Sequence, residues 1–276
     1  SGYGMLEGST LTVVSQGGHI DVPEGGRIAL KGSVLNIQDT RFPSPLAQFD
    51  VQGSGSISSV LSLLNRKPFE IANKVEINAA DISGHVTFEA KIKSTLKKAV
   101  KQRDVSYNVT GVLRNVRTEA LIPEKIILSK SLNFKASPEN VQIFGDGTVS
   151  GVPFSGRWTQ PLDLPGLSSR VALQIEISDA ALRNLNIFLP KEAVSGKANG
   201  YLTLDIEKGS PILFDLKSDL VGVGIDVPAL SWRKATTMPA DFEISGSFSK
   251  PITISEFKLK SEGLSTWGDM AFDDMG

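Results

Sequence analysis

The chain contains no cysteine and only two histidines among its 276 residues. Without thiols, it can form neither disulfide bonds nor thiolate metal sites. Basic and acidic residues number 29 and 30, so the formal net charge is -1. Proteins that bind nucleic acid usually carry a basic excess, and this balance therefore argues against nucleic acid as a partner.

Long apolar runs are also missing. No stretch approaches the roughly 18 apolar residues that indicate a membrane-spanning helix, and no signal peptide opens the chain. Residues 1–4 and 273–276 are turn-like in composition. We therefore expect the sequence to be a fragment of a longer protein, whose own signal or anchor would lie outside it.

Catalytic and cofactor motifs are scarce. His19 follows a Gly-Gly pair, and His85 follows Gly84 on the polar face of an alternating segment. Neither has a spacing that gathers metal ligands, and there is no Gly-x-Ser-x-Gly elbow for a nucleophilic serine. The glycines at 53–55 and 145–147 lack the third glycine of a dinucleotide-binding loop, and turns are predicted there. The sequence thus predicts no catalytic residue, no metal and no cofactor, in a protein that is not an enzyme.

Alternating apolar and polar residues dominate the rest of the chain. In residues 85–93 one face is polar, and the other consists of Val86, Phe88, Ala90 and Ile92. This period of two is typical of an antiparallel strand with one buried and one wet face. The pattern recurs at 171–177, 202–206, 242–244 and 257–259. The pairs Gly17-Gly18 and Asp146-Gly147 predict hairpin turns between such strands.

Two segments have helical periodicity instead. An apolar stripe follows Ser56, a residue suited to cap a helix, and consists of Ile57, Val60, Leu61 and Leu64. Ser178 is expected to cap a second helix over 179–189, which Pro190 would end. Each helix could cover part of a sheet face or merely close one end of a core.

The two β-rich halves resemble each other. Residues 107–116 align with 214–223, so that Tyr107 falls on Phe214, Val109 on Leu216 and Leu113 on Leu220. Repetition at this period indicates a sheet extended unit by unit. We predict a mainly β fold, an elongated and curled antiparallel sheet built from repeated units with two short amphipathic helices, and more than 40% strand. The expected parts are an N-terminal strand region at 1–55 and two helix-plus-strands repeats at 56–165 and 166–276.

Short motifs then carry a resemblance to a known family. Their order and spacing are similar to the AsmA-like superfamily, specifically the YhdP-type branch of large bacterial envelope proteins. They cover most of the chain from about residue 25 onward, and they lie at 61–64, 67–68, 81–84, 104–109, 151–154, 179–189 and 194–196. In addition, residues 229–234, with Leu230, Trp232 and Lys234, resemble a Leu-Gly-Trp-x-Lys signature of that branch.

The resemblance implies a location and an activity. It implies a periplasmic segment of a protein anchored in the bacterial inner membrane, with a hydrophobic groove along a long β-structure. It further implies a role in phospholipid movement between the inner and outer membranes and in outer-membrane integrity. The expected partner is a phospholipid or another acyl-chain lipid, and the family supplies no catalytic residues.

The apolar positions of the aligned runs are the candidate groove residues. They are Phe88, Tyr107, Val109, Leu113, Phe214, Leu216 and Leu220. Alternation looks the same in an open groove and in a closed core, so a structural or protein-interaction module remains the alternative. A basic cluster could meet anionic headgroups or could simply be a solvated face, and it consists of Lys91, Lys93, Lys97, Lys98, Lys101 and Arg103.

Overall fold

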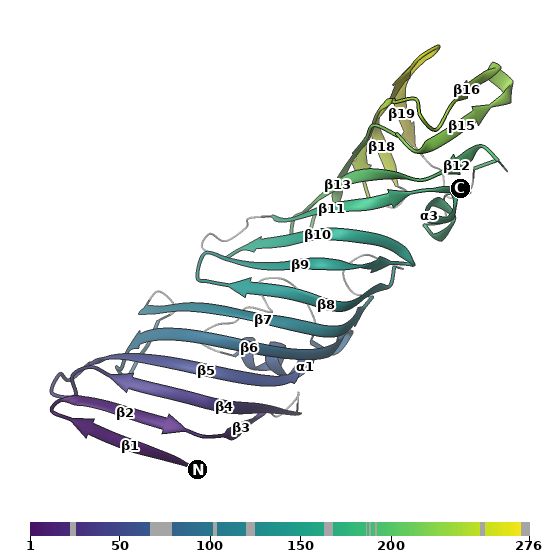
Figure 1. Cartoon of the computed structure of the whole chain (residues 1–276). Helices are drawn as coiled ribbons and strands as arrows, with labels where there is room; N and C mark the ends of the chain where they lie inside the picture. The colour runs from purple at the N-terminus through teal and green to yellow at the C-terminus, as the bar shows by residue number, and fades with distance from the viewer. Residues whose placement is uncertain are drawn as a thin grey trace. The chain divides into compact units, whose positions relative to one another are not determined.

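The fold is mainly β, as the alternation predicts. The computed structural model describes residues 1–22, 26–66, 79–101, 104–119, 125–162, 168–185, 187, 189–190, 192–248 and 252–271. Strands make up 66% of the described residues, chiefly in one antiparallel sheet that is not closed, and two short helices accompany them in the described part of the chain (Figure 1). The predicted fold class is therefore confirmed.

The large sheet has 16 strands in the order β1-β2-β4-β5-β6-β7-β8-β9-β10-β11-β13-β14-β17-β18-β19, with β3 paired to β4. Its strands are β1 Gly2–Glu7, β2 Thr10–Ser15, β3 Gly18–Val22, β4 Gly26–Ile37, β5 Leu46–Ser56, β6 Ile82–Thr95, β7 Val105–Thr118, β8 Ile127–Ala136, β9 Asn140–Val149, β10 Val152–Pro161, β11 Ser169–Ile177, β13 Ala198–Ile206, β14 Leu213–Ser218, β17 Asp241–Ser247, β18 Thr253–Ser261 and β19 Leu264–Ala271. A second sheet, β12-β15-β16, consists of Val194–Gly196, Val223–Val227 and Trp232–Lys234.

The chain divides into two compact units. Unit 1 comprises Ser1–Phe144 and Pro161–Asp163, and unit 2 comprises Gly145–Gln160 and Leu164–Gly276. This division shows where the contacts concentrate, and it does not compare the internal structure of the two halves. The repeats expected at 56–165 and 166–276 therefore stay a prediction.

One face of the unit 1 sheet is apolar. Directly paired residues of antiparallel strands point to the same side, so the strand register shows which side chains share a face. The first two rows on this face are Leu35, Phe49, Ile92 and Tyr107, followed by Val51, Ala90, Val109 and Ala136. The next two are Gly53, Phe88, Gly111 and Phe134, followed by Gly55, Val86, Leu113 and Leu132. The opposite face of β6 carries His85, Thr87, Glu89, Lys91 and Lys93, all exposed.

Helix α1, Ile57–Leu64, packs on one end of this apolar face. The Ser56 hydroxyl accepts a hydrogen bond from the Ser59 backbone N–H at 3.0 Å, which confirms the predicted cap. A closed cluster forms beneath the helix, from Ile57, Val86, Val116 and Leu132. Because these side chains are 9% exposed or less, α1 seals the end of the face that lies next to the C-terminus of β5.

Glycine alternates with phenylalanine across one row of the same face. Gly53 pairs with Phe88, and Gly111 lies between Phe88 and Phe134. A Cβ at Gly53 would lie 2.4 Å from Phe88 Cζ, and one at Gly111 would lie 2.5 Å from Phe134 Cε1. The rings therefore occupy the space above the glycines, as when an aromatic side chain covers a strand glycine. We call these four residues the glycine–phenylalanine row.

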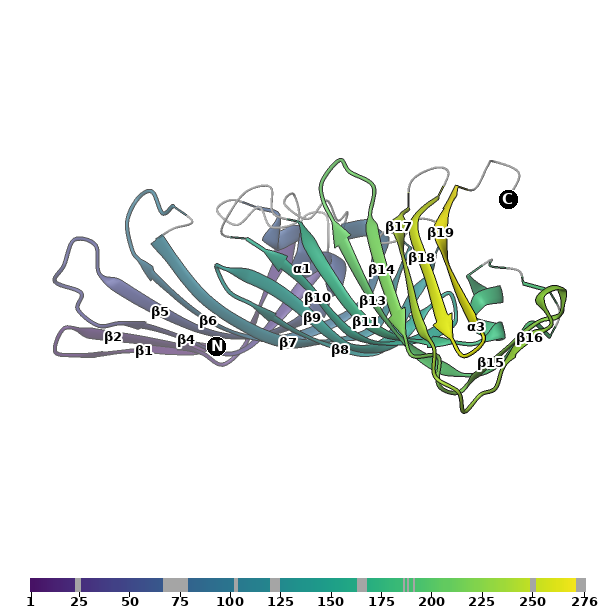
Figure 2. The same ribbon diagram turned by 90° about the horizontal axis from the view of Figure 1, so that it is seen from above.

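Unit 2 follows the same plan with a different covering element. Its apolar face begins with the rows Val171, Leu204 and Phe214, and Leu173, Leu202, Leu216 and Ile244. Figure 2 shows β15 and β16 as a separate pair beside β17, β18 and β19. At this end of the face a closed cluster forms from Leu220, Trp232, Ala240 and Leu259, with Phe242 and Phe257 packed against it.

Some local predictions are wrong. Helix α3, Asp179–Asn184, starts at the predicted cap, where Ser178 Oγ accepts from the Ala181 N–H at 3.2 Å. It ends well before Leu189, because Leu185 already has non-helical backbone angles, φ -90° and ψ 3°.

The predicted glycine turns are also wrong. Residues 53–55 lie inside β5, and residues 145–147 lie inside β9. Gly17 does separate β2 from β3, but both strands pair with β4 and form no hairpin with each other. The turn between β9 and β10 is Ser150-Gly151, whose φ values of 48° and 84° suit a tight hairpin.

Candidate functional site

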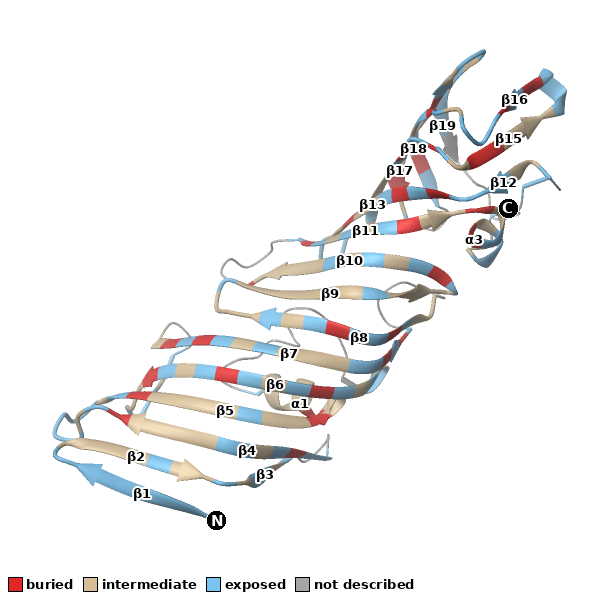
Figure 3. Cartoon of the chain, viewed as in Figure 1, coloured by how far each residue is buried: buried red, intermediate tan, exposed pale blue. Residues whose placement is uncertain are grey.

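The candidate site is the part of each apolar face that the covering elements leave free. In unit 1 the first two rows lie beyond the α1 cluster, towards the turn between β6 and β7. Figure 3 shows that buried, intermediate and exposed residues all occur along β5, β6, β7 and β8. Except for Ala90 and Tyr107, which are buried, the side chains of the two rows stay partly exposed. We call these eight residues the open half of unit 1.

Four predicted groove residues lie on the unit 1 face. Phe88, Tyr107, Val109 and Leu113 all point to the same side, as their pairing shows. Val109 and Tyr107 belong to the open half, whereas Phe88 and Leu113 pack against the α1 cluster. Burial raises the pKa of the Tyr107 phenol, and the charge of Glu139 raises it further, so the phenol remains neutral at physiological pH.

Unit 2 has a corresponding open half. It consists of Val171, Leu173, Leu202, Leu204, Phe214 and Leu216, and all but Leu204 are partly exposed. The predicted residues Phe214 and Leu216 therefore share one open face. The Phe214 ring also packs on Phe248, with ring centroids 4.9 Å apart.

Leu220 does not continue this face, contrary to the expectation from the aligned runs. Strand β14 ends at Ser218, and Leu220 has a φ of 49°. Its side chain is 3% exposed within the closed cluster of unit 2. β7 extends as far as Thr118, and the alignment of Leu113 with Leu220 fails because β14 is the shorter strand.

Sequence reasoning missed Phe49 and Val51 of β5. Both belong to the open half, where Phe49 pairs with Ile92 and Val51 pairs with Ala90. Apolar and polar residues alternate from Ala47 to Val51, and this pattern could have predicted the strand. The turn predicted at residues 53–55 left too short a segment for it.

Two connected loops border the open half of unit 1. The Leu96 backbone N–H donates to the Pro45 carbonyl at 2.9 Å, which joins the turn between β6 and β7 to the loop between β4 and β5. In the first of these loops, Lys97 forms a 2.7 Å ion pair with Asp104. We call this edge of unit 1 the lysine rim, comprising residues 38–46 and the described residues of 96–104. Arg103 of the predicted basic cluster lies outside the described residues.

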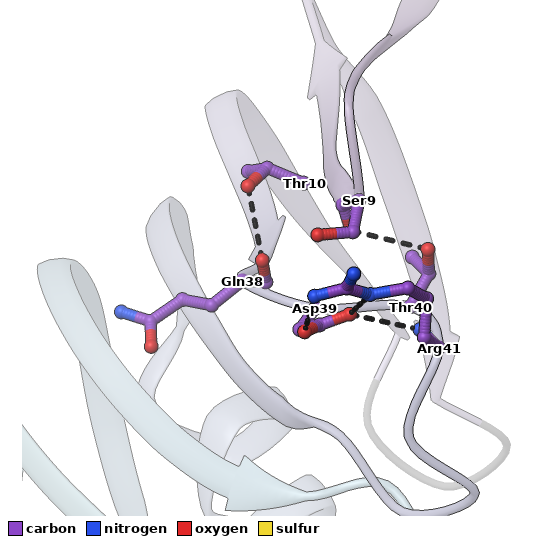
Figure 4. A network of polar contacts seen from close by, with 6 residues as sticks. All are labelled: Ser9, Thr10, Gln38, Asp39, Thr40 and Arg41. Atoms are coloured by element: carbon purple, nitrogen blue, oxygen red, sulfur yellow. Dashed lines mark hydrogen bonds and ion pairs between the residues drawn. The ribbon is translucent and has the colours of Figure 1, made fainter.

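Arg41 and Asp39 neutralise each other on the lysine rim. The guanidinium binds both carboxylate oxygens, with Nε to Oδ1 at 2.9 Å and Nη2 to Oδ2 at 2.6 Å (Figure 4). These hydrogen bonds, with one from the Arg41 backbone N–H, lower the pKa of Asp39 to about 2. Thr40 ties the loop to Ser9, since its backbone N–H and its hydroxyl both donate to the Ser9 carbonyl.

The Trp-x-Lys motif has a structural role in unit 2. Trp232 and Lys234 point inward from β16, while Arg233 between them pairs with Asp226 at the surface. The Trp232 indole N–H donates to the Glu262 carbonyl at 2.9 Å. Lys234 as a whole residue is only 1% exposed. Its ammonium group donates hydrogen bonds to the backbone carbonyls of Leu220 and Val223, each at 2.7 Å. The motif thus fastens β16 over the closed cluster.

Ser231 stands where the resembling signature has glycine, and its φ is 51°. This left-handed conformation costs a non-glycine residue about 1 kcal/mol or more. We expect Ser231→Gly to raise the free energy of unfolding by about 1 kcal/mol, measured by urea denaturation. Ser231→Ala keeps a Cβ and serves as the control without that gain. Equal stability of the two variants would contradict this account.

The described part of the chain contains no group of three or more potential metal ligands, and none of its helices has the length and hydropathy of a membrane span. Comparison with protein-family models, with curated proteins and with solved structures found no match. The fold itself defines the class of protein: an open antiparallel sheet in which each of two units has a partly covered apolar face.

Proposed function

We propose that this chain is a non-catalytic, periplasmic segment of an AsmA-like envelope protein that shelters phospholipid acyl chains and conducts them between the inner and outer membranes. The observation that carries the proposal is the open half of each apolar face, at which hydrocarbon side chains are partly exposed. An acyl chain lying there would cover them. The resemblance of the motifs to the YhdP-type branch supports the same function and location.

The energetics suit a lipid that must both bind and move. Each methylene removed from water contributes about 0.8 kcal/mol, so partial shelter of one acyl chain gives substantial affinity. The rows that form the open halves contain no ionisable side chain except the neutral Tyr107 phenol. Contacts of this kind do not depend on one position along the strand, which favours sliding over fixed binding.

The closed clusters favour the second candidate, a structural module, in part of each unit. Under α1 and under β15–β16 the apolar side chains are sealed by protein. These regions form a core, and the proposed groove is confined to the open halves. A test must therefore change a residue of an open half.

Val109→Glu is the direct test. Because Val109 is partly exposed, its glutamate can reach water, and we expect a folded protein with an unfolding midpoint within a few degrees of wild type. We expect at least a several-fold loss of co-purifying phospholipid, measured by native mass spectrometry, because a carboxylate would displace the acyl chain. Asn108→Glu introduces the same charge at the adjacent, exposed position on the polar face and should retain lipid like wild type.

Two results would count against the conduit. Unfolding of Val109→Glu with a stable Asn108→Glu would show that the position is sealed, which favours the structural module. Unchanged lipid content in a folded Val109→Glu would show that bound lipid does not lie on this face.

A further inference from the structure

Two lysines on the lysine rim have no carboxylate partner among the described residues. The rim has four basic side chains among its described residues, but Asp39 binds Arg41, and Asp104 binds Lys97. Lys98 and Lys101 are exposed and form no ion pair within the described part of the chain. Their two positive charges are therefore available to an anion at this edge of unit 1.

The lysine rim also presents apolar side chains to solvent. Phe42 is 63% exposed. Leu46, the first residue of β5, is 47% exposed, but it alternates with Ala47 and Phe49 and therefore lies on the opposite face of the sheet from the open half. The hydrogen bond from Leu96 to Pro45 connects the loop of Phe42 with the loop of Lys98. Apolar and cationic groups on two connected loops at one edge of a face are the complement of an amphiphile at the junction of its hydrocarbon and its anionic headgroup.

The other end of the same face cannot receive a headgroup in this way. There, α1 packs on Val86 and Leu132, and the cluster beneath it excludes water. The free length begins at Ala90, since Phe88 packs against the α1 cluster, and it runs to Ser94 of β6, which is about 13 Å at the usual rise per residue. One leaflet of a bilayer core, or about the length of one acyl chain, is about 15 Å thick. Most of the length of a single acyl chain therefore fits between α1 and the lysine rim.

We infer that unit 1 binds anionic phospholipids in one orientation, with the acyl chains directed towards α1 and the phosphate-bearing headgroup at Lys98 and Lys101. This inference rests on the proposed lipid-binding function and adds to it a headgroup preference and a direction. The lysines act as exposed positive charges, so the preference falls as ionic strength rises.

The experiment compares headgroup preference with total lipid uptake. Delipidated protein is incubated with vesicles of phosphatidylcholine and phosphatidylglycerol in equal amounts, reisolated, and its bound lipid is quantified by mass spectrometry. We expect wild type to be enriched in phosphatidylglycerol and the double variant Lys98→Glu, Lys101→Glu to lose that enrichment about tenfold, while total lipid changes little. The control Lys91→Glu, Lys93→Glu makes the same charge change on the polar face of β6 and should keep the enrichment.

The outcomes separate this inference from the proposed function. Lipid uptake without a preference for phosphatidylglycerol overturns the inference and leaves the conduit standing. An equal loss of preference in both double variants also overturns it, since that result reflects net charge and not the rim. Absence of any bound lipid overturns the conduit and the inference together.

Discussion

Leu220→Glu is expected to unfold unit 2. Leu220 is 3% exposed and packs with Trp232, Ala240 and Leu259, so the new carboxylate would be buried without a partner. A buried unpaired charge is among the most damaging single changes, and we expect a loss of more than about 4 kcal/mol in the free energy of unfolding. The measurement is urea denaturation followed by tryptophan fluorescence, because Trp232 lies in the same cluster.

The neighbouring residue provides the control for this prediction. Val221 is 47% exposed, and Val221→Glu should change stability by no more than about 0.5 kcal/mol. A Leu220→Glu protein that is as stable as Val221→Glu would mean that the cluster is open to water. Leu220 would then be a groove residue, as its alignment with Leu113 predicts.

Lys234→Met is expected to destabilise unit 2 by about 2 kcal/mol. Methionine fills a similar volume, but it cannot donate hydrogen bonds to the carbonyls of Leu220 and Val223. A buried acceptor left unpaired costs about 1–3 kcal/mol. The Val223 carbonyl loses the ammonium donor, whereas the Leu220 carbonyl still accepts from the Val223 backbone N–H at 3.2 Å. The loss is partly offset because the ammonium group no longer has to be buried. Denaturation of Lys234→Met beside Lys260→Met, which changes an exposed lysine of β18, isolates the effect of burial. Equal stability of these two variants would contradict the proposed role of the motif.

The pH dependence of the same pair gives an independent check. Burial lowers the pKa of Lys234 below the ordinary value of 10.5, although Asp219 opposes this shift. The unfolded state therefore binds the proton more tightly, and wild type should gain stability over Lys234→Met as pH rises towards 10.5. A stability difference that shrinks over this range would mean that the ammonium form is the better accommodated one.

How far the sequence predicts this fold depends on the range of the interaction concerned. The helix starts at Ser56 and Ser178 are correct because a cap is a contact within three residues. The face assignment of β6 is correct because the period of two is local. The turn predicted at Gly53 is wrong because a ring from another strand, that of Phe88, lies over this glycine. That partner lies 35 residues away and leaves no local pattern.

The sequence also could not predict how much of each apolar face stays open. Phe88, Leu113 and Leu220 have the same apolar character as Val109, yet only Val109 lies in an open half. The difference arises from α1 and β15–β16, which cover the face from outside the sheet. Strand length mattered as well, because β14 stops at Ser218 and takes Leu220 out of the aligned run.

The glycine–phenylalanine row has a consequence for how a hydrocarbon would travel. Two phenylalanines on adjacent strands would make a ridge, and two glycines would make a trench. With Gly53, Phe88, Gly111 and Phe134 in alternation, each ring lies over its neighbouring glycine and levels the surface across four strands. This row borders the open half on the side of α1, where Phe88 and Phe134 pack against the closed cluster. Under the proposed function, the end of an acyl chain that reaches the row would meet a small energy barrier there, because the dispersion attraction that a methylene leaves behind at one point is matched at the next.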